Sequence, residues 1–227
     1  GRGDRDLALQ IGTAAGGGII NPRHRGMASK AAIINQSFSD VIIYAPSYVT
    51  DYDMIATNNS YHSAPSGCPG EREYNGLSSY GDAQMMNYEE LQHVFASGND
   101  GGTTCAPYPA SFGTIKSGWQ CGKNILTVGA LNVANNSIAS YSGRGPTADG
   151  RIKPEITTDG YAVLSTTPAN GYDLNYGTSM AAPGVTGALA LMYERYRQTK
   201  AGNNPESALM KAIACNTAED LGNAGPD

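Results

Sequence analysis

The chain of 227 residues is long enough for one sizeable domain with its own hydrophobic core. Apolar residues make up 40 % of it, which argues against disorder, and its 29 glycines and 12 prolines predict a backbone rich in turns. Fifteen basic against twenty acidic residues give a net charge of −5, so the sequence lacks the basic surface that nucleic-acid binding needs. No apolar run approaches the roughly 18 residues of a membrane span, and we predict neither nucleic acid nor membrane as a partner.

Short apolar runs predict buried strands along much of the chain. Several runs are continuous rather than alternating, which is typical of strands that are covered on both faces. The predicted strands are residues 31–38, 54–60, 93–96, 124–131 and 137–141.

Helices are predicted between and after these strands. The first spans residues 82–91, with Asp82 as its cap. The clearest spans residues 178–199, where apolar side chains recur at helical spacing. Its predicted inner face consists of Val185, Leu189, Met192 and Tyr196.

The last predicted helix lies near the end of the sequence. Asn204 is expected to cap it, and Pro205 takes the first helical position. Leu209 and Ile213 are expected to face inward. Because strands and helices alternate, the sequence predicts an α/β fold with a mainly parallel sheet. No repeat or change of composition marks a linker, so residues 1–227 are predicted to form a single domain.

The four cysteines leave the redox state of the chain open. Cys105 and Cys121 enclose a loop that a disulfide would close with a gain of about 3 kcal/mol. The alternative is that both are buried free thiols. Because the chain has no C-x-x-C pair and three histidines, the sequence predicts no zinc site.

Ser179 lies in the segment Gly-Thr-Ser-Met-Ala-Ala-Pro-Gly, residues 177–184, at the first turn of the long predicted helix. The amino end of a helix offers unpaired N–H groups and a positive partial charge, and both stabilise the oxyanion that forms when a serine attacks a carbonyl. The simpler alternative is that Thr178 or Ser179 only caps the helix.

The segment around Ser179 resembles the nucleophile motif of the subtilisin-like serine proteases, the subtilases. Residues 95–101, Phe-Ala-Ser-Gly-Asn-Asp-Gly, are similar to the family's loop that carries the oxyanion asparagine, which assigns that role to Asn99. Three further segments resemble family segments in the same order: residues 26–31, 58–62 and 141–155.

The resemblance covers residues 12–227 and implies a subtilisin-like three-layer sandwich with a mainly parallel central sheet. It also implies a secreted serine endopeptidase. Ser179 would attack the peptide carbonyl to form an acyl-enzyme, while Asn99 and the backbone N–H of Ser179 hold the oxyanion. This chemistry requires no cofactor and no metal ligands are assigned, although the family often uses structural calcium, for which the sequence locates no site.

By the same resemblance, a peptide or protein substrate would lie as an added strand beside Ser60 and Tyr61. His62 stands where the family usually has glycine, so its ring is expected to narrow the channel near the scissile bond. The first substrate side chain would enter a pocket whose walls are Ala96, Ser97 and Gly98.

The histidine and aspartate that normally activate such a serine are missing from the expected places. When Gly12 and Thr13 are aligned with the end of the family's histidine motif, Asp6 falls on the histidine position, and a carboxylate is a weak base for a hydroxyl at neutral pH. The strand with the aspartate would lie earlier still. The fold is therefore expected to lack the family's N-terminal strand, and the chain to be incomplete at both ends.

None of the three histidines takes the place of this base. His24 is expected on the solvated surface, His93 in the interior or at a helix end, and His62 on the substrate edge rather than across from Ser179. Three explanations stay open. The chain is a piece of a larger protease whose histidine and aspartate lie in an N-terminal segment or a second chain; it is a catalytically inactive subtilase-fold peptide-binding or scaffold protein, with Asp6 a true replacement; or its first dozen residues are misassigned.

Overall fold

The computed structural model describes residues 2–38, 40–64, 66–68 and 72–222. A main sheet contains four parallel strands in the order β1, β2, β3, β5, and the short β4 pairs antiparallel with the end of β3. β6 and β7 form a separate antiparallel hairpin. The bounds are β1 (Ala56–Asn59), β2 (Gln92–Ala96), β3 (Leu126–Asn132), β4 (Ser137–Ile138), β5 (Ile156–Asp159), β6 (Val163–Thr167) and β7 (Gly171–Asn175).

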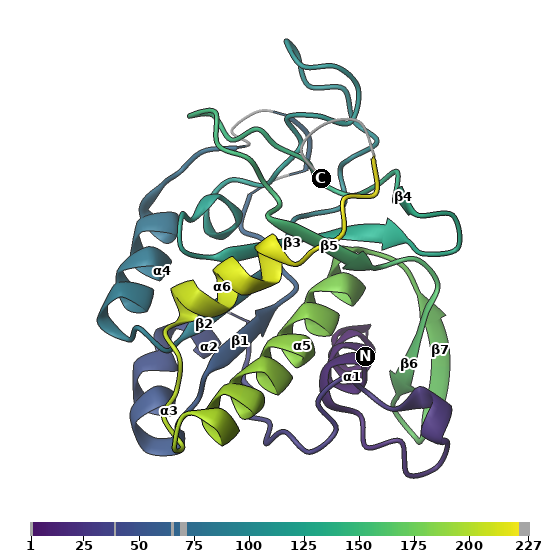
Figure 1. The fold of residues 1–227 in the computed structure, drawn as a ribbon. Coiled ribbons are helices and arrows are strands. Elements are labelled where there is room, and N and C mark those ends of the chain that lie inside the picture. The colour runs from purple at the N-terminus through teal and green to yellow at the C-terminus, as the bar shows by residue number, and fades with distance from the viewer. Residues whose placement is uncertain (1, 39, 65, 69–71, 223–227) are drawn as a thin grey trace.

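Helices cover both faces of the main sheet. Figure 1 shows α5 crossing the sheet, with α1 and α6 beside it, while α4 and α2 pack against the other face. Within the described ranges, every helix is too short or too polar to span a bilayer. The bounds are α1 (Arg2–Ala15), η1 (Pro22–His24), α2 (Asp40–Ile43), α3 (Ala45–Tyr52), α4 (Gly76–Asn87), η2 (Trp119–Cys121), α5 (Thr178–Thr199) and α6 (Ser207–Asn216).

The side chains of β2 point alternately to the two faces of the sheet and so pack into two separate layers of the core. Val94 and Ala96 belong to the cluster beneath α5, whereas Phe95 between them stacks on Trp119 at 5.7 Å and packs near Met85 of α4. Successive side chains of a strand point to opposite faces, so a strand that is apolar throughout must be covered on both faces.

The predicted mixed α/β fold with a mainly parallel sheet is confirmed, as are the bounds of α5.

Residues 31–38 are not a strand, which contradicts the prediction. They carry an apolar run, yet they lie exposed, with Ile33 at 48 % and Phe38 at 69 % of full exposure. A strand needs a hydrogen-bonded neighbour, and within the described ranges β1 pairs only with β2. The helix α1 and the strands β5, β6 and β7 were not predicted.

The predicted helix 82–91 lies too far along the chain. α4 begins after Asn75, whose side chain accepts from the N–H of Leu77 in a capping box with Ser78. Asp82 is buried within the helix and does not cap it. Its carboxylate instead accepts from the backbone N–H of Lys123 and Asn124, each at 2.8 Å, and thereby fixes the loop that leads into β3.

The last helix begins after Glu206, so Asn204 does not cap it. The Asn204 amide instead donates to Asp53 and Glu90. The predicted inner face is also wrong, because Leu209 and Ile213 are about 40 % exposed whereas Met210 is buried. A helix that starts later than predicted presents a different face to the core.

The predicted disulfide between Cys105 and Cys121 is wrong. Cys105 bonds to Cys68, 37 residues earlier, and so joins the loop after β1 to the loop after β2. Cys121 is a buried free thiol that donates to the carbonyl of Lys116 at 3.1 Å, and burial raises its pKa to about 12.

His93 lies in the interior in a single tautomer. The Gln84 amide donates to the carbonyl of Ile42, so its oxygen faces His93 Nε2, which must donate across 3.0 Å. Because the ring proton is on Nε2, Nδ1 is an acceptor, and the Thr57 hydroxyl, which itself accepts from Asn59, donates to it across 2.9 Å. Burial lowers the pKa of His93 to about 4, because a charged imidazolium would lose its hydration in the interior.

This network predicts that the protein loses stability in mild acid. Unfolded His93 takes up a proton near its ordinary pKa of 6.5, and folded His93 does so only near 4. The free energy of unfolding should therefore fall by about 3 kcal/mol as the pH drops from 6.5 to about 4. Above pH 6.5, His93 is neutral in both states and should not affect it. Denaturant titrations across pH 4 to 7 measure the slope. The pH dependence of the free energy of unfolding should be weaker in His93→Gln. It should be unchanged in His62→Gln, because the His62 side chain is exposed. Equal pH dependence in the wild type and both variants would contradict the role given to His93.

Candidate active site

Ser179 lies in the first turn of α5, where the chain arrives from the β6–β7 hairpin. Gly177 is the N-cap residue of the helix, with a φ of +138°, and it has no side chain with which to cap the helix. Capping by Thr178 or Ser179, the simpler role considered for this segment, is therefore excluded. Ser179 is half-buried, and its N–H belongs to the first helical N–H groups, which have no partner inside the helix. The positive end of α5 thus faces the space beside Gly177.

Asn99, in the loop after β2, is held by the same helix end. Its Oδ1 accepts from the N–H of Thr178 at 2.9 Å and from the hydroxyl of Thr178 at 3.1 Å. Two donors on one oxygen fix the orientation of the amide, so Nδ2 points away from Thr178. A methyl group built on Gly177 would lie 3.4 Å from Asn99 Nδ2 and 3.7 Å from the nitrogen of Ser179. The Asn99 amide, whose Oδ1 lies 3.5 Å from the same point, and the Ser179 N–H therefore border one small space beside Gly177.

Contacts of Gly98 hold the loop that carries Asn99 in place. Gly98 has a φ of +108°, and a side chain there would meet Lys116, which is buried and paired with Asp100. The backbone of Gly98 accepts from Gly143 and its N–H donates to the Thr178 hydroxyl at 3.2 Å. These contacts fix the loop on both sides of Asn99.

The predicted substrate edge lies next to Ser179. The Ser60 hydroxyl donates to the carbonyl of Ser179 at 3.2 Å. Tyr61 and Ala96 are bridged by Gln120, whose amide donates to the Tyr61 carbonyl at 2.8 Å and to the Ala96 carbonyl at 3.2 Å. Sequence reasoning missed Gln120, because no local pattern shows that it joins two loops.

The other predicted substrate-binding residues border this edge. Ser97 is buried, and its hydroxyl has no hydrogen-bond partner among the described residues. His62 is exposed, with its Nδ1 2.7 Å from the carbonyl of Ala64. It shares an open recess of about 380 Å³ with Phe38, Tyr61, Ser63, Leu77 and Trp119.

No histidine lies within hydrogen-bonding distance of Ser179 in the part of the chain that the structure describes. His93 is buried in the network described above. His24 is half-buried, not on the solvated surface as expected, because its ring packs 4.2 Å from that of Tyr172. His62 is exposed next to Tyr61, and its place on a substrate edge stays a prediction.

Asp6 lies on α1, which packs against α5 and β6. One turn further along the same face, Gln10 accepts from the Asn58 amide at 3.3 Å, and Asn58 in turn accepts from Thr186 of α5 at 3.1 Å. Asn58 is two residues before Ser60. The face of α1 that carries Asp6 is thus tied to the strand and the helix that border Ser179.

Metal ligands do not gather in the described ranges, where no three His, Cys, Asp or Glu side chains come together.

Comparisons with known proteins agree with this architecture. Pyrolysin of Pyrococcus furiosus is 40 % identical over 74 residues, which are 32 % of this chain and 5 % of pyrolysin. Subtilisin DY of Bacillus licheniformis is 34 % identical over 100 residues, 44 % of this chain and 30 % of that protein. The matched parts thus span less than a third of these relatives.

The CspB protease of Clostridium perfringens has a similar fold. Its structure superimposes with a TM-score of 0.79 at 16 % identity, covering 100 % of this chain and 79 % of that one. The model of the subtilase family, Peptidase_S8, matches residues 8–227. The chain therefore belongs to the subtilase family.

Proposed function

We propose that this chain is the core of a serine endopeptidase that cleaves peptide bonds through an acyl-enzyme on Ser179. One observation carries the proposal. The N–H of Ser179 and the amide of Asn99 border the same small space beside Gly177.

The chemistry follows from that geometry. A substrate carbonyl would place its oxygen in the space beside Gly177 while Ser179 Oγ attacks the carbon. The negative charge that develops on the oxygen would accept hydrogen bonds from Asn99 Nδ2 and the Ser179 N–H, aided by the dipole of α5. Loss of the amine leaves the acyl-enzyme, which water then hydrolyses. These steps use side chains and backbone alone and require no cofactor.

The substrate would run along the residues that meet Ser179. Ser60 and Tyr61 would pair with its main chain, and Ala96, Ser97 and Gly98 would surround its first side chain. The recess beside Tyr61 and His62 would then accept a second, apolar side chain, since Phe38, Leu77 and Trp119 line it. Main-chain pairing of this kind favours broad specificity.

The base that takes the Ser179 proton would come from elsewhere. β1 pairs only with β2 within the described ranges, so its other edge is unpaired there, and Ile33 and Phe38 of the segment 31–38 are exposed. An unpaired strand edge is a ready template for another strand. We infer that a strand from an N-terminal segment or a second chain adds there and brings the imidazole and the carboxylate.

Action outside the cytoplasm is supported by the disulfide between Cys68 and Cys105. Structural disulfides persist in oxidising compartments and are rare in the cytosol. We therefore propose that the protein is secreted.

An inactive peptide-binding or scaffold protein is the second candidate. It is favoured by Asp6, a carboxylate on the face of α1 that is tied to the surroundings of Ser179, where the family has its base. The two candidates differ in whether Ser179 is activated.

We expect the 227-residue chain alone to turn over peptides about 10⁶-fold more slowly than an intact subtilase, which is the cost of losing the histidine in subtilisin. Peptide hydrolysis and labelling by a fluorophosphonate probe measure this. Efficient cleavage that Ser179→Ala abolishes would contradict the expectation and identify a base within the chain.

Asp6→His should restore part of the missing function. An imidazole at this position would act as a general base. It should raise the rate at which the probe labels Ser179 by about 10²-fold or more. Gln10→His, one turn along the same face of α1, is the matched control and should give no gain. If neither or both variants react faster, Asp6 does not occupy the position of the base.

Asn99→Asp should slow the reaction of Ser179 by roughly 10²- to 10³-fold, the cost of one oxyanion donor in subtilisin. The aspartate keeps an acceptor for Thr178 but replaces the donor. Thr178→Val is the control, because it removes the hydroxyl bonds and keeps the N–H that orients Asn99, and its effect should stay below about tenfold. Rates are compared by hydrolysis of a peptide p-nitrophenyl ester, corrected for Ser179→Ala. Unchanged hydrolysis in Asn99→Asp would rule out its role.

A further inference from the structure

Three consecutive backbone carbonyls turn toward one point just before β3. The carbonyl oxygens of Lys123, Asn124 and Ile125 lie 3.0, 3.3 and 3.0 Å from the ammonium nitrogen of Lys211. Successive peptide groups of an extended strand face alternate directions, so this convergence depends on the bend that the chain makes over residues 123–125. Converging oxygens of this kind are what a hard cation binds.

A buried carboxylate completes the group of oxygens. Glu155 Oε1 accepts from Lys211 and from Lys153, each at 2.7 Å, and Oε2 accepts from the N–H of Thr127 at 2.9 Å. Burial alone would raise the pKa of Glu155, yet that pKa is lowered, because the two ammonium groups stabilise its charge. We refer to the carbonyl oxygens of residues 123–125 and Glu155 Oε1 as the oxygen cage.

The bend is polarised from its other side as well. The Asp82 carboxylate accepts from the N–H groups of Lys123 and Asn124, each at 2.8 Å. A carboxylate that takes the N–H groups and an ammonium that takes the carbonyls align the peptide dipoles of the bend between two opposite charges. The bend therefore requires positive charge at the place where the Lys211 ammonium lies.

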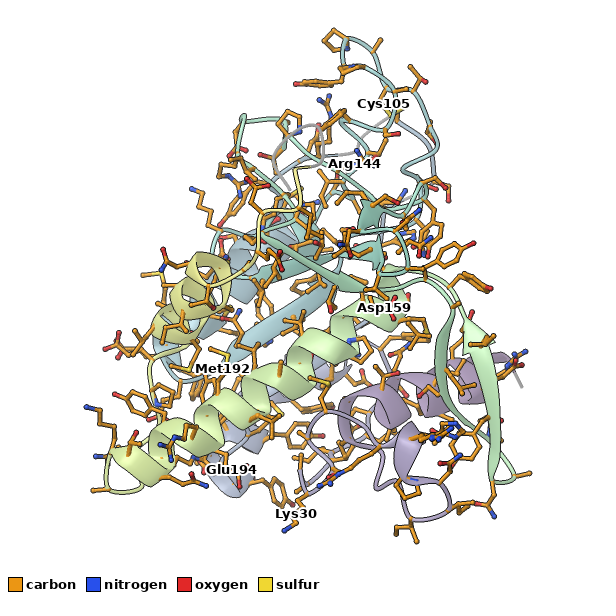
Figure 2. All side chains as sticks on the ribbon, turned by 45° about the vertical axis from the view of Figure 1, so that its right-hand side comes forward. Lys30, Cys105, Arg144, Asp159, Met192 and Glu194 are labelled. Atoms are coloured by element: carbon orange, nitrogen blue, oxygen red, sulfur yellow. A yellow bond between two sulfur atoms is a disulfide. The ribbon has the colours of Figure 1, made fainter. Side chains whose placement is uncertain are left out.

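Lys211 brings this charge from α6, a helix remote from the bend in sequence. Its bonds to the three carbonyls join residues 86 to 88 positions apart. Figure 2 shows α6, in yellow, beside α5 on the side where Met192 is labelled. Met210, the neighbour of Lys211, is buried in the core cluster beneath α5. The ammonium thus fixes the polar side of α6, and Met210 fixes its apolar side.

We propose that the Lys211 ammonium acts as a tethered monovalent cation, and that the oxygen cage binds a free potassium or ammonium ion when this side chain is removed. An ammonium has three N–H groups, whereas the cage offers four oxygens, so charge rather than directional bonding explains the arrangement. Without Lys211, the charges of Glu155 and Lys153 cancel, as they do in their ion pair, and one positive charge restores the original balance.

The size of the oxygen cage favours the same class of ion. Its oxygens lie 2.7 to 3.3 Å from the Lys211 nitrogen, farther than the roughly 2.0 to 2.6 Å at which magnesium and calcium bind oxygen. Backbone carbonyls replace the hydration shell of potassium in channel filters, so this kind of ligand suits that ion.

Lys211→Ala empties the oxygen cage and opens it to ions from solution. In tetramethylammonium chloride, whose cation is too large to enter, the midpoint of thermal unfolding should lie about 10 °C below that of the wild type. Potassium chloride or ammonium chloride at the same concentration, about 0.2 M, should recover about 5 °C of this loss. The wild type should differ by less than about 1 °C among the three salts, because its cage is filled.

Arg197→Ala is the matched control. Its guanidinium pairs with the Asp53 carboxylate at 2.7 Å, so this change deletes an ion pair without emptying the oxygen cage, and the three salts should act on it alike. Equal recovery of Lys211→Ala in all three salts would indicate general screening and would overturn the proposal. Stabilisation by calcium at lower concentrations than potassium would overturn it too, because the cage would then take a divalent ion.

A second variant decides the question if Lys211→Ala is unfolded in every salt. Lys211→Gln keeps two N–H donors for the carbonyls but carries no charge. Its unfolding midpoint should lie about 5 °C below that of the wild type, because hydrogen bonds to a charged donor are the stronger ones. A Lys211→Gln variant as stable as the wild type would show that hydrogen bonds suffice, and would overturn the role of Lys211 as a cation.

Discussion

One hydrogen bond organises the candidate site, from the N–H of Thr178 to the side-chain oxygen of Asn99. It joins the loop after β2 to the start of α5, two segments that lie 79 residues apart in sequence. Because the N–H and the hydroxyl of Thr178 both donate to that oxygen, the amide nitrogen points away from Thr178 and borders the space beside Gly177. A single contact therefore fixes the loop and sets the direction of the donor.

The parallel sheet makes this contact available. β1 and β2 run side by side, so their carboxyl ends deliver Ser60 and Asn99 to the same edge. The interior between them is polar, since Thr57, Asn59 and His93 bond to one another inside the sheet. Each of these groups has a fixed donor or acceptor role, which specifies the alignment of β1 on β2 more tightly than apolar packing would.

The sequence predicted the elements that its local patterns determine. α5 was predicted with its bounds because Val185 and Leu189 recur at helical spacing and face the core. Apolar runs also located β2 and β3. The prediction of a strand at residues 31–38 was wrong for the opposite reason. The segment has the composition of a strand, but among the described residues it has no neighbouring strand to pair with, and pairing is a property of the whole fold.

The candidate site, too, could be predicted only where its residues lie in local sequence motifs. Ser179 and Asn99 lie in short contiguous motifs, and a resemblance carried by such motifs identifies them. Gln120 bridges two loops through contacts 59 and 24 residues away, which no local pattern encodes. The partner of Cys105 was missed for the same reason: loop length favoured Cys121, but tertiary structure places that residue in the core.

The disulfide has a consequence for the mechanics of the proposed groove. Cys68 belongs to the loop after Ser60 and Tyr61, and Cys105 to the loop after Asn99, so one covalent link ties the two walls between which a peptide would lie. The walls cannot drift apart independently, and the conformational entropy of ordering them is lost when the bond forms rather than when a peptide arrives. The separation of the two loops is thereby constrained before any peptide binds.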